Sequence, residues 1–161
     1  MDLHLKDRVV FITGPAKGMG RAVSLAFARE GARLVLVGRD TKAIDPVANE
    51  AQALGVSAIV LACDVTDDAQ TQAAVAKALA AFGSIDVLVN VAGGSGPIGK
   101  TGWETSTEEF NEIVELNMTG CFNTMRSVLP SMIERKEGRI VYVGGSCGMR
   151  GRAGRMAYSA S

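Results

Sequence analysis

The sequence predicts an α/β fold in which a doubly wound parallel sheet carries helices on both faces. Short runs rich in Val, Ile and Leu alternate regularly with longer segments of helical periodicity along the chain. Ala, Val and Leu supply most of the 47% hydrophobic content, which suits buried parallel strands packed against helices. A chain of 161 residues is expected to form one domain, here residues 1–161.

The predicted elements follow one another in strand–helix order. Residues 8–14, RVVFITG, form a β-branched run that ends in glycine, and residues 19–31 repeat apolar side chains at helical spacing. Further strands are predicted at residues 32–38, 57–65, 85–94 and 138–145, and further helices at residues 41–55, 66–83 and 106–138. Ser106 and Glu109 predict a capping box at the start of the last helix, and Pro130 is expected to bend or interrupt it. Residues 93–102 are glycine-rich enough for a mobile lid.

Composition excludes several classes of protein. The formal net charge is zero, so no general nucleic-acid surface is expected. Cys63, Cys121 and Cys147 lie far apart without zinc-type spacing, which favours a reduced, cytoplasmic protein with no metal site. The charged start MDLHLKDR lacks the apolar core of a signal peptide, and no run approaches the ~20 apolar residues of a membrane span.

The turn after the first predicted strand carries informative glycines. Gly14, Gly18 and Gly20 in TGPAKGMG follow a strand and open a helix, which is the context of a dinucleotide-binding turn. Without Cβ atoms the backbone can approach a pyrophosphate, whose charge is favoured at a helix N-terminus. Glycine spacing alone would also suit any tight strand–helix turn. P-loop chemistry is excluded because no Gly-Lys-Ser/Thr follows the turn.

Five motifs in register carry a family resemblance: TGPAKGMG, CDVTD, NVAG, the asparagine of ELNMTG, and AYSAS. Over residues 8–161 the chain resembles the short-chain dehydrogenase/reductase family. The resemblance implies a Rossmann-type sheet, a nicotinamide cofactor, and hydride transfer to or from a small carbonyl or alcohol, as in a 3-oxoacyl reductase or a related ketoreductase. The residues it places at the cofactor are Gly14, Gly18, Met19, Gly20, Asp64, Val65, Asn90, Ala92 and Gly93. Asp64 is implied to accept from the adenine amino group.

The residues after the second predicted strand bear on the choice of cofactor. An NAD site usually offers an acidic residue there, whereas this chain has Gly38 and then Arg39, whose guanidinium suits a 2′-phosphate. Lys17 adds a second positive charge nearby. Each could be an ordinary surface cation, and Asp40 could instead pair with Arg39. Together the two cations favour NADP(H) over NAD(H).

The resemblance also implies a catalytic tyrosine and a proton-relay asparagine. Tyr158 matches the tyrosine of the family's Tyr-x-x-x-Lys motif, whose lysine would come directly after Ser161. Asn117 lies on the apolar stripe of the long helix and matches the asparagine that holds a relay water in the family. The chain therefore looks like an N-terminal portion that lacks the C-terminal strands and has little turnover, and the full-length protein is expected to be a homo-oligomer.

Gly145 stands where the family has its substrate-orienting serine, thirteen residues before Tyr158. Either Ser146 takes that role or the role is vacant, and we favour Ser146. Arg150, Arg152 and Arg155 follow, and indicate recognition of an anionic substrate, a subunit contact or a solvated surface. The alternative function is a non-catalytic NADP(H)-binding sensor or scaffold.

Overall fold

The computed structural model describes residues 2–161. Five parallel strands form one sheet in the order β3-β2-β1-β4-β5, which confirms the predicted doubly wound architecture. The strands are β1 (Val9–Thr13), β2 (Arg33–Gly38), β3 (Ala58–Ala62), β4 (Val87–Asn90) and β5 (Arg139–Tyr142). The strand order reverses between β1 and β4, where Thr13 pairs with Asn90. In open sheets of this kind, ligands bind at the carboxyl ends of the strands beside that reversal.

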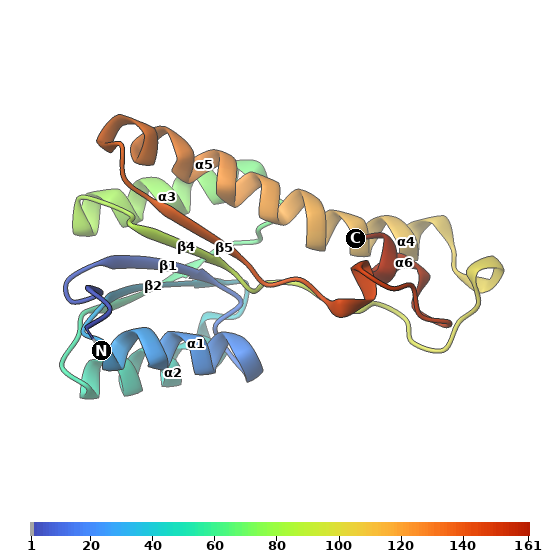
Figure 1. Ribbon diagram of the computed structural model, residues 1–161, viewed down its shortest axis with the longest axis horizontal. Coiled ribbons are helices and arrows are strands. Elements are labelled where there is room, and N and C mark those ends of the chain that lie inside the picture. The colour runs from blue at the N-terminus through green and yellow to red at the C-terminus, as the bar shows by residue number, and fades with distance from the viewer. Residues whose placement is uncertain (1) are drawn as a thin grey trace.

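Helices cover both faces of the sheet (Figure 1). Side chains of alternate strand residues enter opposite layers, as the strand geometry requires. Val10 and Ile12 pack toward α1 (Gly18–Arg29) and α2 (Thr41–Ala53). Val9 and Phe11 pack instead with residues of α3 (Asp68–Phe82) and α5 (Gly120–Arg135). The core is therefore two apolar layers separated by the sheet.

The helix predicted at residues 106–138 is not one regular α-helix in the structure. It begins after the predicted Ser106–Glu109 capping box as α4 (Thr107–Val114), passes through a π-helical turn at Glu115–Thr119, and continues as α5. Pro130 was predicted to bend or interrupt the helix, and it does not interrupt it, because α5 continues through it to Arg135. Pro130 is exposed, so the helical carbonyl that it leaves without an N–H partner can be solvated.

A smaller lobe extends beyond the carboxyl edge of the sheet (Figure 1). It contains α4, the short helix α6 (Met156–Ala160) packed against it, and two 3₁₀ turns at Gly102–Glu104 and Ser146–Gly148. Residues 91–101, which include most of the predicted lid, form no helix or strand. The polypeptide enters the lobe after β4, leaves it through α5, and returns to it after β5, so the site lies where lobe and sheet meet (Figure 1).

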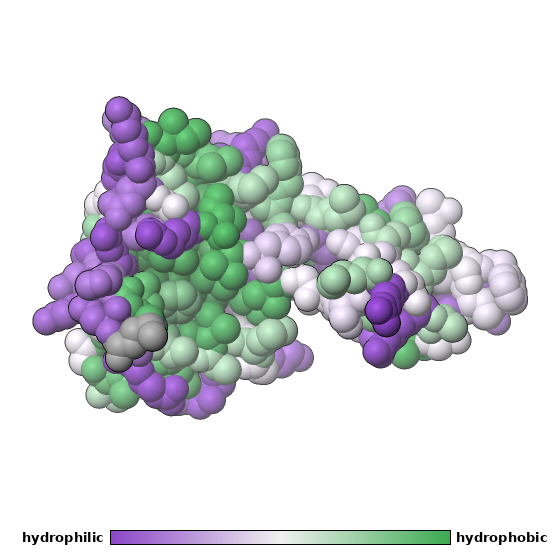
Figure 2. Space-filling model, in the orientation of Figure 1, coloured by the Kyte–Doolittle hydropathy of each residue, from purple (hydrophilic) through white to green (hydrophobic). Residues whose placement is uncertain are grey.

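The edge strand β5 is exposed along all four residues. Ile140, Val141 and Tyr142 present apolar surface there. Figure 2 shows apolar atoms gathered between the two helical layers, in the region where Figure 1 places β4 and β5. Within residues 2–161, β5 thus forms an edge of the sheet with no further strand paired to it.

A buried carboxylate, Asp86, links neighbouring strands at their amino ends, opposite to the glycine turn. Asp86 accepts hydrogen bonds from the Val9 N–H at 2.8 Å and from Arg135 Nη1 at 2.8 Å, with Arg8 at 3.9 Å. Burial raises the pKa of Asp86, but these donors and cations outweigh burial and hold its pKa below the ordinary value. The cluster is structural and lies at the edge opposite to the glycine turn.

Candidate functional site

The glycine turn packs directly on the loop that follows β4. Gly14 adopts φ +67°, and a Cβ there would lie 2.9 Å from the backbone N and Cα of Ala92. A Cβ at Gly20 would overlap the Gly14 carbonyl oxygen. Both positions therefore exclude side chains, and the β1–α1 turn can approach a bound ligand as closely as the backbone allows.

The N-terminus of α1 forms the end of this turn and offers backbone N–H groups that have no intrahelical partner. Lys17 is the N-cap residue and makes no side-chain capping bond. The N–H groups of Gly18, Met19 and Gly20 precede the first intrahelical bond, which Arg21 makes to the Lys17 carbonyl. Backbone donors of this kind, together with the helix dipole, favour a phosphate group.

Asn90 lies behind the site, with its side chain only 2% exposed. Its Oδ1 accepts from Thr124 Oγ1 at 2.8 Å and lies 3.5 Å from Thr13 Oγ1. Thr13 Oγ1 in turn accepts from the N–H groups of Val91 and Ala92, both at 3.1 Å. The Asn90 side chain therefore supports the loop, and the backbone of the following residues forms the surface.

One cavity lies beside the glycine turn and is lined by Gly14, Gly38, Arg39, Asp64, Val65 and Gly93. Asp64 Oδ1 accepts from the N–H and the hydroxyl of Thr66, at 3.0 and 2.8 Å. Asp64 Oδ2 lies 3.9 Å from Arg39 Nη1. Asp40 caps α2 by accepting from the Ala43 N–H, so Arg39 pairs with Asp64 and not, as the sequence left open, with Asp40.

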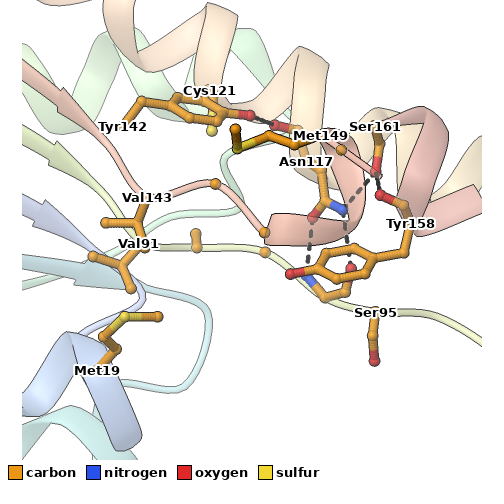
Figure 3. Close-up of a pocket in the computed structure, with 16 residues that line it drawn as sticks. Met19, Val91, Ser95, Asn117, Cys121, Tyr142, Val143, Met149, Tyr158 and Ser161 are labelled. Carbon is orange, nitrogen blue, oxygen red and sulfur yellow. Dashed lines mark hydrogen bonds between the residues drawn. The ribbon is translucent and has the colours of Figure 1, made fainter. Parts of the chain in front are cut away.

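A second cavity shares Ala92 and Gly93 with the first and is lined on its other side by residues of the smaller lobe, and Figure 3 shows its lining residues. Met19, Ala92 and Gly93 border it on the sheet side, and Asn117 and Tyr158 on the lobe side. Thus the structure brings together the glycine turn, NVAG and the terminal tyrosine, which lie in three separate parts of the sequence. Residues 2–161 bring no three metal-binding side chains together.

The Asn117 side chain, 7% exposed, bonds to protein groups at both ends of its amide (Figure 3). Its Oδ1 accepts from the Gly94 N–H at 2.9 Å, and its Nδ2 donates to the Gly94 carbonyl at 2.9 Å. Nδ2 also donates to Ser161 Oγ at 2.8 Å. Asn117 therefore ties the π-helical turn to the loop after β4 and to the end of α6.

Tyr142, at the end of β5, is a site residue that the sequence did not single out. Its hydroxyl donates to the Asn117 carbonyl at 2.6 Å, across the cavity wall. Burial of the hydroxyl, followed by the effect of the neighbouring Cys121 thiol, raises the pKa of Tyr142 to about 12. The ring is half exposed, but the hydroxyl is turned inward and stays protonated at neutral pH. Only strand alternation could have indicated that Tyr142 faces the helix carrying Asn117.

A sequence profile of the short chain dehydrogenase family matches residues 8–161. The chain belongs to this family. An uncharacterized oxidoreductase of Myxococcus xanthus is 36% identical over 160 residues, which are 98% of this chain and 62% of that protein. The 3-oxoacyl-acyl-carrier-protein reductase FabG of Thermotoga maritima is 33% identical over 159 residues, which are 99% of this chain and 64% of that protein.

Two solved structures share the fold of this chain. An NAD⁺-bound xylitol dehydrogenase superposes with a TM-score of 0.94 at 28% identity, over 97% of this chain and 60% of that one. An actinorhodin polyketide ketoreductase with NADPH gives a TM-score of 0.90 at 32% identity, over 96% of this chain and 59% of that one. This chain thus spans about three fifths of the length of these relatives.

Gly145 lies against Tyr158, the tyrosine that the family resemblance singles out. A Cβ at Gly145 would overlap the Tyr158 hydroxyl. Ser146 is exposed on the following 3₁₀ turn and is not among the described residues that line the cavity. The structure thus brings position 145, and not Ser146, against the Tyr158 hydroxyl.

The three arginines that the sequence singled out after Ser146 lie on the smaller lobe, as does Trp103 in the turn at Gly102–Glu104. Arg150 and Arg152 are exposed, and Arg155 is the N-cap residue of α6. Trp103 is 88% exposed and does not line either cavity described above. None of the helices in residues 2–161 combines the length and apolar character of a bilayer-crossing segment.

Proposed function

We propose that this chain forms the dinucleotide-binding part of an NADP(H)-dependent oxidoreductase that acts on a small carbonyl or alcohol. One observation carries the proposal: two cavities at the carboxyl ends of the strands share Ala92 and Gly93 in their walls. The adenosine-side cavity is the one lined by Gly14, Arg39 and Asp64, and the Tyr158 cavity is the one lined by Met19, Asn117 and Tyr158. The pyrophosphate is assigned to the N–H groups at the start of α1. The adenine is assigned to Asp64 and the Val65 backbone, and the nicotinamide half to Ala92 and Gly93, with Asn90 supporting them.

The preference for NADP(H) is proposed on charge. Arg39 lines the adenosine-side cavity, and its side chain is 74% exposed. Its guanidinium can therefore bind a 2′-phosphate while part of it stays hydrated, which keeps the cost of desolvation low. Lys17 is exposed at the start of α1 on the same edge. Gly38 gives the second strand no acidic side chain to repel a phosphate. Of the two solved structures with this fold, one is bound to NAD⁺ and one to NADPH, so the fold itself does not decide between the two cofactors.

Tyr158 is proposed as the proton donor to the substrate oxygen. A bound nicotinamide supplies or accepts the hydride at the substrate carbon. In the reduction, the Tyr158 hydroxyl would give its proton to the carbonyl oxygen, so that the ketone, one hydride at carbon and one proton at oxygen together yield the alcohol. Asn117 is proposed to hold the π-helical turn and the loop after β4 in place, and no side chain at position 145 provides a second hydroxyl.

The substrate is proposed to be a small ketone or alcohol of the 3-oxoacyl or ketoreductase type. Arg150, Arg152 and Arg155 lie on the lobe beside the cavity, and they favour a substrate that carries an anionic group. A homo-oligomeric, cytoplasmic protein is proposed for the full-length form.

A non-catalytic NADP(H)-binding sensor or scaffold is the second candidate, and the absence of a hydroxyl at Gly145 favours it. Calorimetric titration with NADPH and NADH tests the shared binding step, and tighter binding of NADPH is expected. Absorbance of the reduced nicotinamide across a panel of ketones, with a chain extended through a lysine after Ser161, separates the candidates. Consumption of NADPH supports the reductase, whereas tight binding without consumption supports the sensor.

A further inference from the structure

Helix α5 holds the loop that follows β3 through a single buried amide. Asn123 is 5% exposed, and its Nδ2 donates to the Val65 carbonyl at 3.0 Å and to the Thr66 carbonyl at 3.2 Å. These carbonyls lie 58 and 57 residues away along the chain. Both protons of the amide nitrogen are thus committed to one loop, which fixes the loop relative to the helix.

The helix backbone also approaches this loop closely. A Cβ at Gly120, one turn before Asn123, would lie 2.7 Å from Val65 Cγ2. Gly120 therefore allows Val65 to pack against the helix. Asn123 holds the two successive carbonyls of Val65 and Thr66. Together they set the position of the backbone beside the adenosine-side cavity.

The position of this loop determines where the Asp64 carboxylate points. Thr66 donates both its N–H and its hydroxyl to Asp64 Oδ1, and the Asp64 N–H donates to Gln70 Oε1 at 3.0 Å. Asp64 Oδ1 is therefore occupied, while Oδ2 is left on the side of the cavity and of Arg39. Since the Thr66 carbonyl is held by Asn123, the carboxylate is oriented from α5 through Thr66.

We propose that Asn123 is a positioning residue for an adenine subsite, which it sets by directing Asp64 Oδ2 toward the adenine amino group. This inference rests on the proposed dinucleotide-binding function and adds a determinant of base recognition that lies outside the cavity. Asn123 does not line the cavity, so its effect on the ligand passes entirely through the loop.

The test compares NADPH with its analogue that carries hypoxanthine in place of adenine and so lacks the amino group. For the unchanged chain, calorimetry is expected to show about tenfold tighter binding of NADPH, because a hydrogen bond to a charged group is lost with the analogue. In Asn123→Leu the two dissociation constants are expected to agree within roughly twofold. A merely structural role would weaken both ligands equally and leave their ratio unchanged.

Ser127→Ala is the matched control, because Ser127 lies one turn later on α5 and bonds only to the Asn123 carbonyl. It is expected to keep the tenfold preference. Should Asn123→Leu not give folded protein by circular dichroism, Asn123→Asp keeps the side-chain size, removes the amide donors, and carries the same expectation. A preference retained in the Asn123 variant, or absent from the unchanged chain, overturns the inference alone. Failure of the unchanged chain to bind NADPH overturns the proposed function as well.

Discussion

Replacing Arg39 with alanine should weaken NADPH binding selectively. A charge-assisted hydrogen bond to a phosphate contributes about 1.5–3 kcal/mol, and the exposure of Arg39 places it near the lower end. In the free chain Arg39 lies 3.9 Å from Asp64, and this exposed ion pair contributes at most about 1 kcal/mol. Arg39 would give up that pairing when it binds the 2′-phosphate. The net loss is therefore about 1–2 kcal/mol, or about 5- to 30-fold in the NADPH dissociation constant. NADH has no 2′-phosphate and should lose almost nothing.

Calorimetric titration of both reduced cofactors against the unchanged chain and Arg39→Ala measures this difference. Arg29→Ala is the matched control, since Arg29 is an exposed arginine in the last turn of α1, at the end remote from the site. Raising the salt concentration should narrow the NADPH advantage of the unchanged chain, because exposed charges are screened. An equal loss for NADH and NADPH, or an unaltered NADPH affinity, would refute the assignment of the 2′-phosphate to Arg39.

Three further outcomes are expected. Asp86→Asn should lower the free energy of unfolding by about 2–3 kcal/mol in urea denaturation, since Arg135 loses its carboxylate partner. A loss under about 1 kcal/mol would contradict this. Because the pKa of Asp86 is lowered in the folded state, its stabilisation is present above the ordinary aspartate pKa of about 4 and is lost as pH falls further. The free energy of unfolding should therefore fall less steeply with decreasing pH in Asp86→Asn than in the unchanged chain, and equal slopes would refute this. Tyr142→Phe should speed hydrogen exchange of the Gly94 N–H selectively, because Asn117 loses the bond that holds its turn, whereas the exposed-strand control Val141→Ala should not.

The features set by local chemistry could be predicted from the sequence. Apolar β-branched runs gave the strands, and the Ser106–Glu109 capping box marked the start of α4. The glycine turn followed from the same logic, since Gly14 and Gly20 are required by backbone contacts that leave no room for Cβ atoms. The capping box and the contact of Gly20 with the Gly14 carbonyl lie within a few residues of the structure that they predict, whereas the contact of Gly14 with Ala92 is long-range.

The features that depend on packing between distant segments could not be predicted. The π-helical turn at Glu115–Thr119 has no sequence signal comparable to Pro130, which suggested an interruption at the wrong place. Whether position 145 or Ser146 meets Tyr158 depends on the path of the loop between β5 and α6. Asn123 looked like an ordinary helix residue, because its partners lie more than fifty residues away.

Assigned amide spectra during a titration with NADPH test most directly whether a dinucleotide lies along the carboxyl edge of the sheet. The N–H signals of residues 14–20, 64–66 and 91–94 should shift together and saturate at one stoichiometric site. Signals at the Asp86 end of the sheet should stay unchanged. Shifts confined to that opposite end, or no shifts from a folded chain with any of the four pyridine dinucleotides, would contradict the account.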